Sequence, residues 1–214
     1  MADVEIRTYD DPCGVARALD VIGQRWAMLV VRELLLGPKR FRDLLHGLHG
    51  MSPNVLSQRL RELEASGVVS RESAGPPVGA VVYRLTDDGA ALEPALIELG
   101  RWGRRRPQHA DGPMSTDALW LAFRTTFESV RAADLVATIE LRVGADRVVL
   151  TVADQGLRMH RGSASTPDAV VVGDVAGVRA MVYRPTTVAE AVDAGTVTID
   201  GDQTAVQRLV DCLR

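Results

Sequence analysis

Cysteine and aromatic residues are scarce in this sequence. Two of the 214 residues are cysteines, Cys13 and Cys212, and Phe, Trp and Tyr together make up 4%. Two cysteines so far apart exclude a disulfide framework and a cysteine-based metal site, and they are typical of a reducing cytoplasm. With so few aromatic residues, the core has to be built from Leu, Val, Ile and Ala.

Signals for export and membrane insertion are also missing. The first residues, MADVEIRTYDD, are charged where a signal peptide needs an apolar segment. The strongest apolar run, WAMLVVRELLL, is short and is interrupted by Arg32 and Glu33, so it cannot span a bilayer. We therefore expect a cytoplasmic protein that does not act at a membrane.

The sequence has no recognisable motif for catalysis or for a bound cofactor. A glycine-rich phosphate loop and a nucleophile elbow are both absent. The stretch DGD at 200–202 lacks the rest of a calcium loop, so Asp202 is expected to cap a helix. The histidines lack partners at metal-ligand spacing: His46, His49, His109 and His160. We expect no enzymatic activity, no cofactor and no metal.

The first half of the chain is mostly helical in pattern. Helices are predicted from Asp11-Pro12, from about Arg25 to Gly37-Pro38, over 41–45, and from Ser52-Pro53 to Ser66-Gly67. Two strand-like runs, 68–73 and 81–85, flank a Gly/Pro connection and predict a hairpin. Thr86 is expected to cap one closing helix up to Trp102. The inward side chains of the first two helices are expected to be Val15, Leu19, Ile22, Trp26, Leu29, Val30 and Leu34. This order of elements is that of a winged helix-turn-helix.

The second half has a different pattern. A helix over 115–133 precedes strand-like runs at 135–143, 147–154, 157–162 and 167–174, then two short helical segments, a strand at 196–200 and a terminal helix. The overall fold class is therefore α+β, with a mostly antiparallel sheet covered by helices in the second domain. We expect a winged helix-turn-helix domain at 1–103, a polar linker at 104–114 and the second domain at 115–214.

The stretch MSPNVLSQRLREL, residues 51–63, predicts a helix with two different faces. At 100° per residue, Leu56, Leu60 and Leu63 form one buried stripe. Side chains able to contact base edges or phosphates lie opposite this stripe or flank it: Ser52, Asn54, Val55, Ser57, Gln58 and Arg61. Arg59 lies beside the stripe, so both a structural ion pair, for instance with Asp43, and a DNA contact remain open.

Positive charge is concentrated around this helix although the whole chain carries a net charge of −3. Between Gly37 and Arg61, five basic residues and one acidic residue give a net charge of +4: Lys39, Arg40, Arg42, Arg59 and Arg61 against Asp43. A local basic surface of this kind is what phosphate neutralisation needs. We therefore add Lys39, Arg40 and Arg42 to the predicted DNA contacts.

Residues 13–103 resemble the HxlR-type winged-helix regulators, relatives of the MarR group. The matching stretches are CGVARALDVIGQRW, LLLGPKRFRDL, GMSPNVLSQRLRELEASGVVSR, VYRLTDDG and LEPALIELGRWG. The resemblance implies a homodimer built by the first and last helices, which places the 52–66 helix in the major groove of a pseudo-palindromic double-stranded operator. The wing tip AGPPVGA lacks basic residues, so Arg71 and Arg84 are the wing candidates.

In some members of that family a cysteine at the position of Cys13 senses oxidants or electrophiles. The helix N-terminus favours a thiolate there, whereas Asp10 and Asp11 oppose it. The simpler interpretation is a packing cysteine, and the alternative is a redox site at Cys13.

Residues 115–214 resemble the sterol-carrier-protein-like fold, which implies an apolar cavity between helices and sheet. The candidate lining residues are Trp120, Phe123, Phe127, Met159, Met181, Val182 and Tyr183, although an ordinary packed core has the same pattern. We predict a dimeric DNA-binding transcription regulator, a repressor, controlled by an apolar small-molecule effector in this domain; a domain that serves only to dimerise is equally compatible with the sequence. The alternatives are a thiol-based sensor acting through Cys13 and a lipid carrier whose first module only mediates protein contacts.

Overall fold

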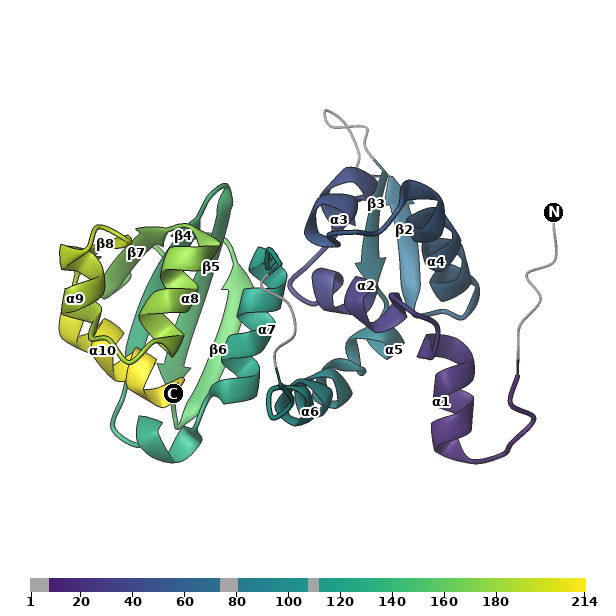
Figure 1. Cartoon of the computed structure of the whole chain (residues 1–214), viewed down its shortest axis with the longest axis horizontal. Helices are drawn as coiled ribbons and strands as arrows, with labels where there is room; N and C mark the ends of the chain where they lie inside the picture. Colours follow the sequence, from purple (N-terminus) through teal and green to yellow (C-terminus); the bar gives the residue numbers. More distant parts are fainter. Residues whose placement is uncertain (1–7, 74–80, 108–111) are drawn as a thin grey trace. The chain divides into compact units, whose positions relative to one another are not determined.

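The structure is a computed structural model that describes residues 8–73, 81–107 and 112–214. The chain divides into two compact units, Met1–Leu99 and Gly100–Arg214, which are described separately (Figure 1). Within the described ranges, no helix is both long enough and apolar enough to cross a membrane.

The first unit has the predicted winged helix-turn-helix order. Two helices precede a two-residue strand, the helix pair α3 and α4 follows, and the hairpin β2–β3 leads into two closing helices. The strands form one antiparallel sheet in the order β1-β3-β2. The element bounds are α1 (Gly14–Ile22), α2 (Ala27–Leu34), β1 (Lys39–Arg40), α3 (Phe41–Gly47), α4 (Pro53–Ala65), β2 (Val69–Ser73), β3 (Val81–Leu85), α5 (Asp87–Ala90) and α6 (Glu93–Gly103).

Two details of the first two helices differ from the prediction. The helix α1 begins at Gly14 rather than Pro12, because the Asp11 carboxylate accepts a hydrogen bond from the Cys13 amide in a turn before the helix. In α2 the buried stripe is Ala27, Val30, Val31 and Leu34, an i, i+3, i+4, i+7 series. Leu29 lies off that stripe and is exposed, and on α1 Val15 and Leu19 are exposed as well, so these three inward assignments were wrong for the single chain.

The closing helix is interrupted, although one continuous helix was predicted. The Thr86 hydroxyl caps the short α5 by accepting a hydrogen bond from the Gly89 amide at 3.0 Å, as expected. Pro94 then lies in the first turn of α6. Proline has no amide hydrogen to continue the bonding of α5 and is tolerated in a first turn, so the chain starts a new helix there.

The second unit is a five-stranded sheet covered by helices, which confirms the α+β class. The strand order is β6-β5-β4-β7-β8, and every neighbouring pair is antiparallel except β4–β7. The helices α8, α9 and α10 cover one face of the sheet (Figure 1). The element bounds are α7 (Thr116–Thr126), the 3-10 helix η1 (Ser129–Ala132), β4 (Ala137–Val143), β5 (Asp146–Ala153), β6 (Gly156–Arg161), β7 (Ala169–Gly173), α8 (Val175–Tyr183), α9 (Val188–Asp193), β8 (Val197–Gly201) and α10 (Gln203–Cys212).

The helix predicted over 115–133 is shorter than expected. It ends at Thr126, where the Thr125 and Thr126 hydroxyls donate hydrogen bonds to the carbonyls of Ala122 and Phe123. Two consecutive β-branched residues that bond back to the helix do not favour its continuation. The predicted cap of the last helix is confirmed, because Asp202 accepts hydrogen bonds from the Thr204 and Ala205 amides.

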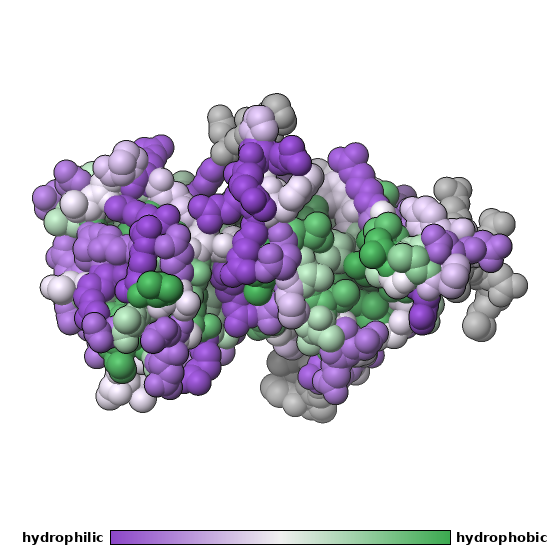
Figure 2. Space-filling view, turned by 90° about the horizontal axis from the view of Figure 1, so that it is seen from below, coloured by the Kyte–Doolittle hydropathy of each residue, from purple (hydrophilic) through white to green (hydrophobic). Residues whose placement is uncertain are grey.

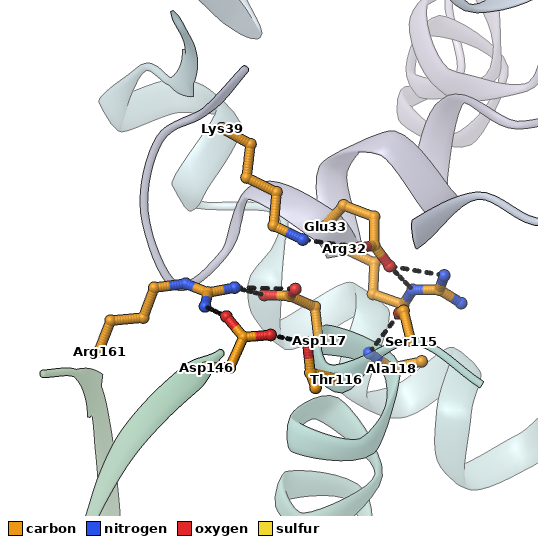
Figure 3. Close-up of polar contacts among 9 residues, drawn as sticks. All are labelled: Arg32, Glu33, Lys39, Ser115, Thr116, Asp117, Ala118, Asp146 and Arg161. Carbon is orange, nitrogen blue, oxygen red and sulfur yellow. Dashed lines mark hydrogen bonds and ion pairs between the residues drawn. The ribbon is translucent and has the colours of Figure 1, made fainter. Parts of the chain in front are cut away.

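The start of α7 is fixed to the sheet by a charged cluster. The Arg161 guanidinium on β6 donates to both carboxylate oxygens of Asp117, at 2.6 and 2.8 Å, and also bonds Asp146 (Figure 3). The Asp146 carboxylate accepts a second hydrogen bond from the Thr116 hydroxyl. The first turn of α7 is therefore held against the ends of β5 and β6.

Candidate nucleic-acid interface

The helix α4 has the two faces that the sequence predicts. The Ser52 hydroxyl accepts a hydrogen bond from the Val55 amide at 3.3 Å, and Pro53 is the first helical residue. Leu56, Leu60 and Leu63 are almost fully buried. The helix is therefore anchored along one stripe and capped at the end where base contacts begin in helix-turn-helix proteins.

The opposite face of α4 is open to solvent. Asn54, Gln58 and Arg61 are exposed, while Val55 and Ser57 are half-buried. The Gln58 amide donates a hydrogen bond to Glu62 at 3.0 Å, four residues further along the helix. Gln58 therefore has to exchange this intrahelical bond for any contact with a base.

Arg59 does not belong to this open face. Its side chain is 10% exposed and forms an ion pair with Glu62 on the same helix. Among the described residues, no hydrogen bond or ion pair joins Arg59 to Asp43, the partner that the sequence offered. The geometry favours a structural role for Arg59.

The basic residues of β1 and of the first turn of α3 lie in two different environments. Arg40 and Arg42 are exposed. The Lys39 ammonium lies 2.8 Å from the Glu33 carboxylate, and its side chain is only 13% exposed (Figure 3). Arg40 and Arg42 can reach a phosphate as they stand, whereas Lys39 already neutralises a buried carboxylate.

Glu33 is a residue whose importance the sequence pattern did not reveal. Its side chain is fully buried on α2 and accepts hydrogen bonds from the Arg32 and Lys39 side chains. A Cβ on Gly47 of α3 would come within 2.2 Å of the Glu33 carboxylate, so glycine leaves room for it. The available signal was a pair of charges inside the apolar run WAMLVVRELLL.

The two wing arginines point to opposite faces of the hairpin. In the β2–β3 register, Arg71 pairs with Tyr83 and Arg84 pairs with Ser70, one position along. Successive side chains of a strand alternate between faces, so Arg71 and Arg84 are not brought together. Arg84 also lies 3.3 Å from Glu72. The predicted wing tip, residues 74–80, lies outside the described residues.

In the second unit, the predicted cavity residues lie on α7 or directly after it, on β6 and on α8. Five of the seven are buried: Trp120, Phe123, Met159, Met181 and Val182. Phe127 is half-buried, and Tyr183 is 37% exposed. The Trp120 and Phe123 rings meet edge to face at 5.6 Å, and Phe123 lies 6.4 Å from the Tyr183 ring. The structure thus brings several candidates into one apolar cluster.

Comparisons with known proteins identify the family of the first unit. Residues 21–111 match the family model described as HxlR-like helix-turn-helix. An HTH-type transcriptional regulator of Bacillus subtilis, YvaP, is 42% identical over 86 residues, which cover 40% of this chain and 80% of YvaP. The chain belongs to the HxlR-like helix-turn-helix family.

Other relatives match the same part of this HxlR-like chain. The transcriptional regulator YodB of Bacillus subtilis is 34% identical over 85 residues, covering 40% of this chain and 76% of YodB. A solved structure of reduced YodB covers 46% of this chain and 98% of its own, with 31% identity and a TM-score of 0.41. The relatives are named as regulators of transcription, so the HxlR-like unit is a DNA-binding regulator module.

The second unit matches a different family model. Residues 112–214 match the model described as alkyl sulfatase C-terminal. The sterol-carrier-like resemblance expected from the sequence is not confirmed by this match. The chain therefore joins an HxlR-like module to a second module whose matched family takes its name from an enzyme.

Cys13 is the N-cap of α1 in the HxlR-like unit, and its thiol is exposed. The thiol was expected to pack and to be opposed by Asp10 and Asp11. Instead, the nearby Val15 and Ala16 backbone amides lower the pKa of Cys13. Amides at a helix N-terminus stabilise the thiolate, and here they outweigh the opposing effect of desolvation.

Proposed function

We propose that the chain is a sequence-specific transcription regulator that binds a pseudo-palindromic operator as a homodimer, with α4 in the major groove. The main support is the division of α4 into a buried leucine stripe and an exposed line of Asn54, Gln58 and Arg61. Amide side chains can pair with adenine and an arginine with guanine or phosphate. The other proposed contacts are Ser52, Val55, Ser57, Arg40, Arg42, Arg71 and Arg84.

Two helices of the chain support the dimer. The helix α1 buries none of its residues in the single chain, and Val15 and Leu19 on it are 68% and 42% exposed. On α6, Leu99 and Trp102 are also exposed. Figure 2 views the side on which α1 and α6 project in Figure 1, and it shows apolar residues open on that side of the first unit. A second copy that covers these side chains would bury area that water otherwise contacts.

Binding to labelled DNA from upstream of the chain's own gene tests the proposal. Fluorescence anisotropy is measured from 50 to 300 mM salt with the upstream fragment and with a shuffled fragment of equal length. We expect tighter binding to the upstream fragment and affinity that falls steeply with salt. Equal affinity for both fragments would overturn sequence-specific binding at that site.

The dimer has its own test. Leu19→Glu puts a charge on an exposed position of α1, so the fold of the single chain should be kept. Sedimentation should give a dimer for the original chain and a monomer with weakened DNA binding for the variant. A variant that remains dimeric at micromolar concentration would contradict an interface at α1.

We assign the regulator a repressor role, because a dimer on an operator excludes other proteins from that DNA. Transcription in vitro from the bound promoter should fall as protein is added, and a rise would identify an activator instead. Such a protein would work in the cytoplasm, with working domains of 1–103 and 115–214 joined by 104–114.

An apolar effector in the second unit is proposed as the controlling signal. The buried cluster on α7, β6 and α8 supports this, since methionine adapts readily to apolar ligands. A thiol sensor is the second candidate, favoured by the exposed Cys13 and its lowered pKa. If oxidants still release DNA from a Cys13→Ser variant, the thiol sensor is excluded. If DNA binding fails and lipid is recovered from the purified protein, the carrier alternative replaces both.

A further inference from the structure

The indole nitrogen of Trp120 is a buried donor without an acceptor. In the described part of the chain, Trp120 Nε1 and Arg59 Nε are the buried side-chain nitrogens without a hydrogen-bond partner. Arg59 still has its other nitrogens for Glu62, whereas the indole has a single donor. An unsatisfied buried donor costs about 1–3 kcal/mol, so its persistence calls for an explanation.

The side chains placed around this donor are not suited to holding a water molecule. On α7, Leu119 and Phe123 are fully buried neighbours, and the Phe123 ring meets the indole edge to face. The Thr126 hydroxyl is already engaged with the Phe123 carbonyl and with the Tyr183 hydroxyl at 3.2 Å. A buried water needs two to four polar partners, and among these groups only the Thr126 and Tyr183 hydroxyls are polar, both already hydrogen-bonded.

The cluster reaches the surface at one end. Trp120 and Phe123 are each 1% exposed, while Tyr183, next in the chain of ring contacts, is 37% exposed. The Tyr183 hydroxyl faces the interior even though part of the side chain is open, because it shares a hydrogen bond with the buried Thr126 hydroxyl, and burial raises its pKa. A molecule entering beside Tyr183 would pass Phe123 before it reaches the indole.

We propose that the second unit binds an uncharged, mostly apolar molecule with one strong hydrogen-bond acceptor, of the ketone or ester class, which accepts the Trp120 Nε1–H. Its apolar part packs against Phe123 and the buried, adaptable Met159 and Met181. A charged acceptor at the indole does not fit, because the Phe123 ring in contact with it carries no charge and burying an unpaired charge is costly. The inference rests on the proposed effector function and names the chemistry of that effector.

The test uses the full chain labelled with nitrogen-15 in its three tryptophan indoles. Each indole gives one proton–nitrogen resonance, and Trp120→Phe identifies that of Trp120, leaving Trp26 and Trp102 as internal references. The probe is 2-octanone. Octane is the control compound without a hydrogen-bond acceptor, and octanoate is the control compound with a charge. We expect the Trp120 proton resonance to move downfield saturably with the ketone, and neither control compound to produce that shift.

Two variants measure the contribution of the hydrogen bond. Trp120→Phe should lower the affinity for 2-octanone about fivefold to tenfold, the value of one neutral hydrogen bond. Val130→Ala, on an exposed side chain of the second unit, should leave it unchanged. If Trp120→Phe does not fold, Trp26→Phe and Trp102→Phe assign the other two resonances, and the shift of the remaining Trp120 resonance in the original chain still decides the question.

Three outcomes would overturn the inference. A Trp120 resonance unmoved by the ketone would mean no acceptor reaches it, and one already downfield in the free protein would indicate an internal water. An equal shift with octanoate would mean that the site does not discriminate charge. DNA binding is measured separately by anisotropy, so a shifted resonance with unchanged DNA affinity would keep the site and remove only its regulatory role.

Discussion

The Lys39 ammonium lies 2.8 Å from the carboxylate of Glu33, a side chain with no solvent exposure. The pair joins α2 to β1, which in turn hydrogen-bonds to the wing strand β3. The α3 backbone at Gly47 packs directly against the same carboxylate. One buried acid thus fixes the relative positions of α2, the wing sheet and the helix that precedes α4.

Removing this acid should destabilise the first unit strongly. Glu33→Ala removes the buried carboxylate to which the Arg32 and Lys39 side chains are bonded, and breaking a buried ion pair typically costs about 3–5 kcal/mol. Urea unfolding, followed by circular dichroism, measures the loss. Glu72→Ala is the matched control, because Glu72 pairs with Arg84 on the surface and its loss should cost about 0–1 kcal/mol. Equal losses in the two variants would contradict the role given to Glu33.

Lys39 should contribute less to phosphate binding than its charge suggests. Each phosphate contact contributes about 0.9 to the slope of log affinity against log salt. We expect Arg42→Met to reduce that slope by about this amount and Lys39→Met to change it little, since Lys39 neutralises Glu33. Equal reductions would show that Lys39 leaves Glu33 to contact DNA.

Some of this architecture follows directly from local sequence rules. Short-range patterns predict both the start and the buried face of α4. These patterns are the Ser52 cap, Pro53 in the first turn and the leucine stripe. Asp202 at the start of α10 is another such case. The exposed polar line of α4 was therefore predictable without the structure.

Other features depend on contacts that a linear pattern does not contain. Leu29 is as apolar as Val30, and only the direction of α2 against the core distinguishes them. One partner of Glu33, Lys39, lies six residues away on a strand of two residues. The opposite orientations of Arg71 and Arg84 follow from the hairpin register, and the unpaired indole of Trp120 follows from its surroundings.

The Cys13 thiol should react at a lower pH than an ordinary cysteine. The Val15 and Ala16 amides stabilise the thiolate and lower its pKa, whereas burial raises the pKa of Cys212. Alkylation by iodoacetamide is followed by mass spectrometry across a pH series. The pH at which Cys13 reacts at half its maximal rate should be lower than the corresponding pH for a cysteine in a short unstructured peptide. Cys212 should stay unmodified in the folded protein. A Cys13 midpoint at or above that of the peptide would contradict the helix-terminus effect.

Glu140 should make the second unit sensitive to acid. It is 1% exposed on β4, and the Arg142 side chain, at 2.7 Å, and the Ala164 amide lower its pKa. A lowered folded pKa stabilises the fold above the unfolded pKa of about 4.3, and this stability is lost as pH falls through the folded value. Glu140→Gln should cost on the order of 1–3 kcal/mol at pH 7.

The pH dependence provides the check on Glu140. Urea unfolding of the second unit is followed by Trp120 fluorescence for the original chain and for Glu140→Gln. The two curves of unfolding free energy against pH should converge as the pH falls below about 4. A difference that stays constant from pH 7 to pH 3 would mean that the substitution acts through packing rather than through the charge.

The measurement that tests the central claim most directly is selection of binding sites from random DNA, with the original chain and with Asn54→Ala and Gln58→Ala. Gln203→Ala, an exposed glutamine on α10, is the control. We expect the original chain and Gln203→Ala to enrich the same pseudo-palindrome. Each α4 variant should lose discrimination at one symmetric base position, by about 1–3 kcal/mol. An unchanged preference in both α4 variants would show that the exposed face of α4 does not contact the bases.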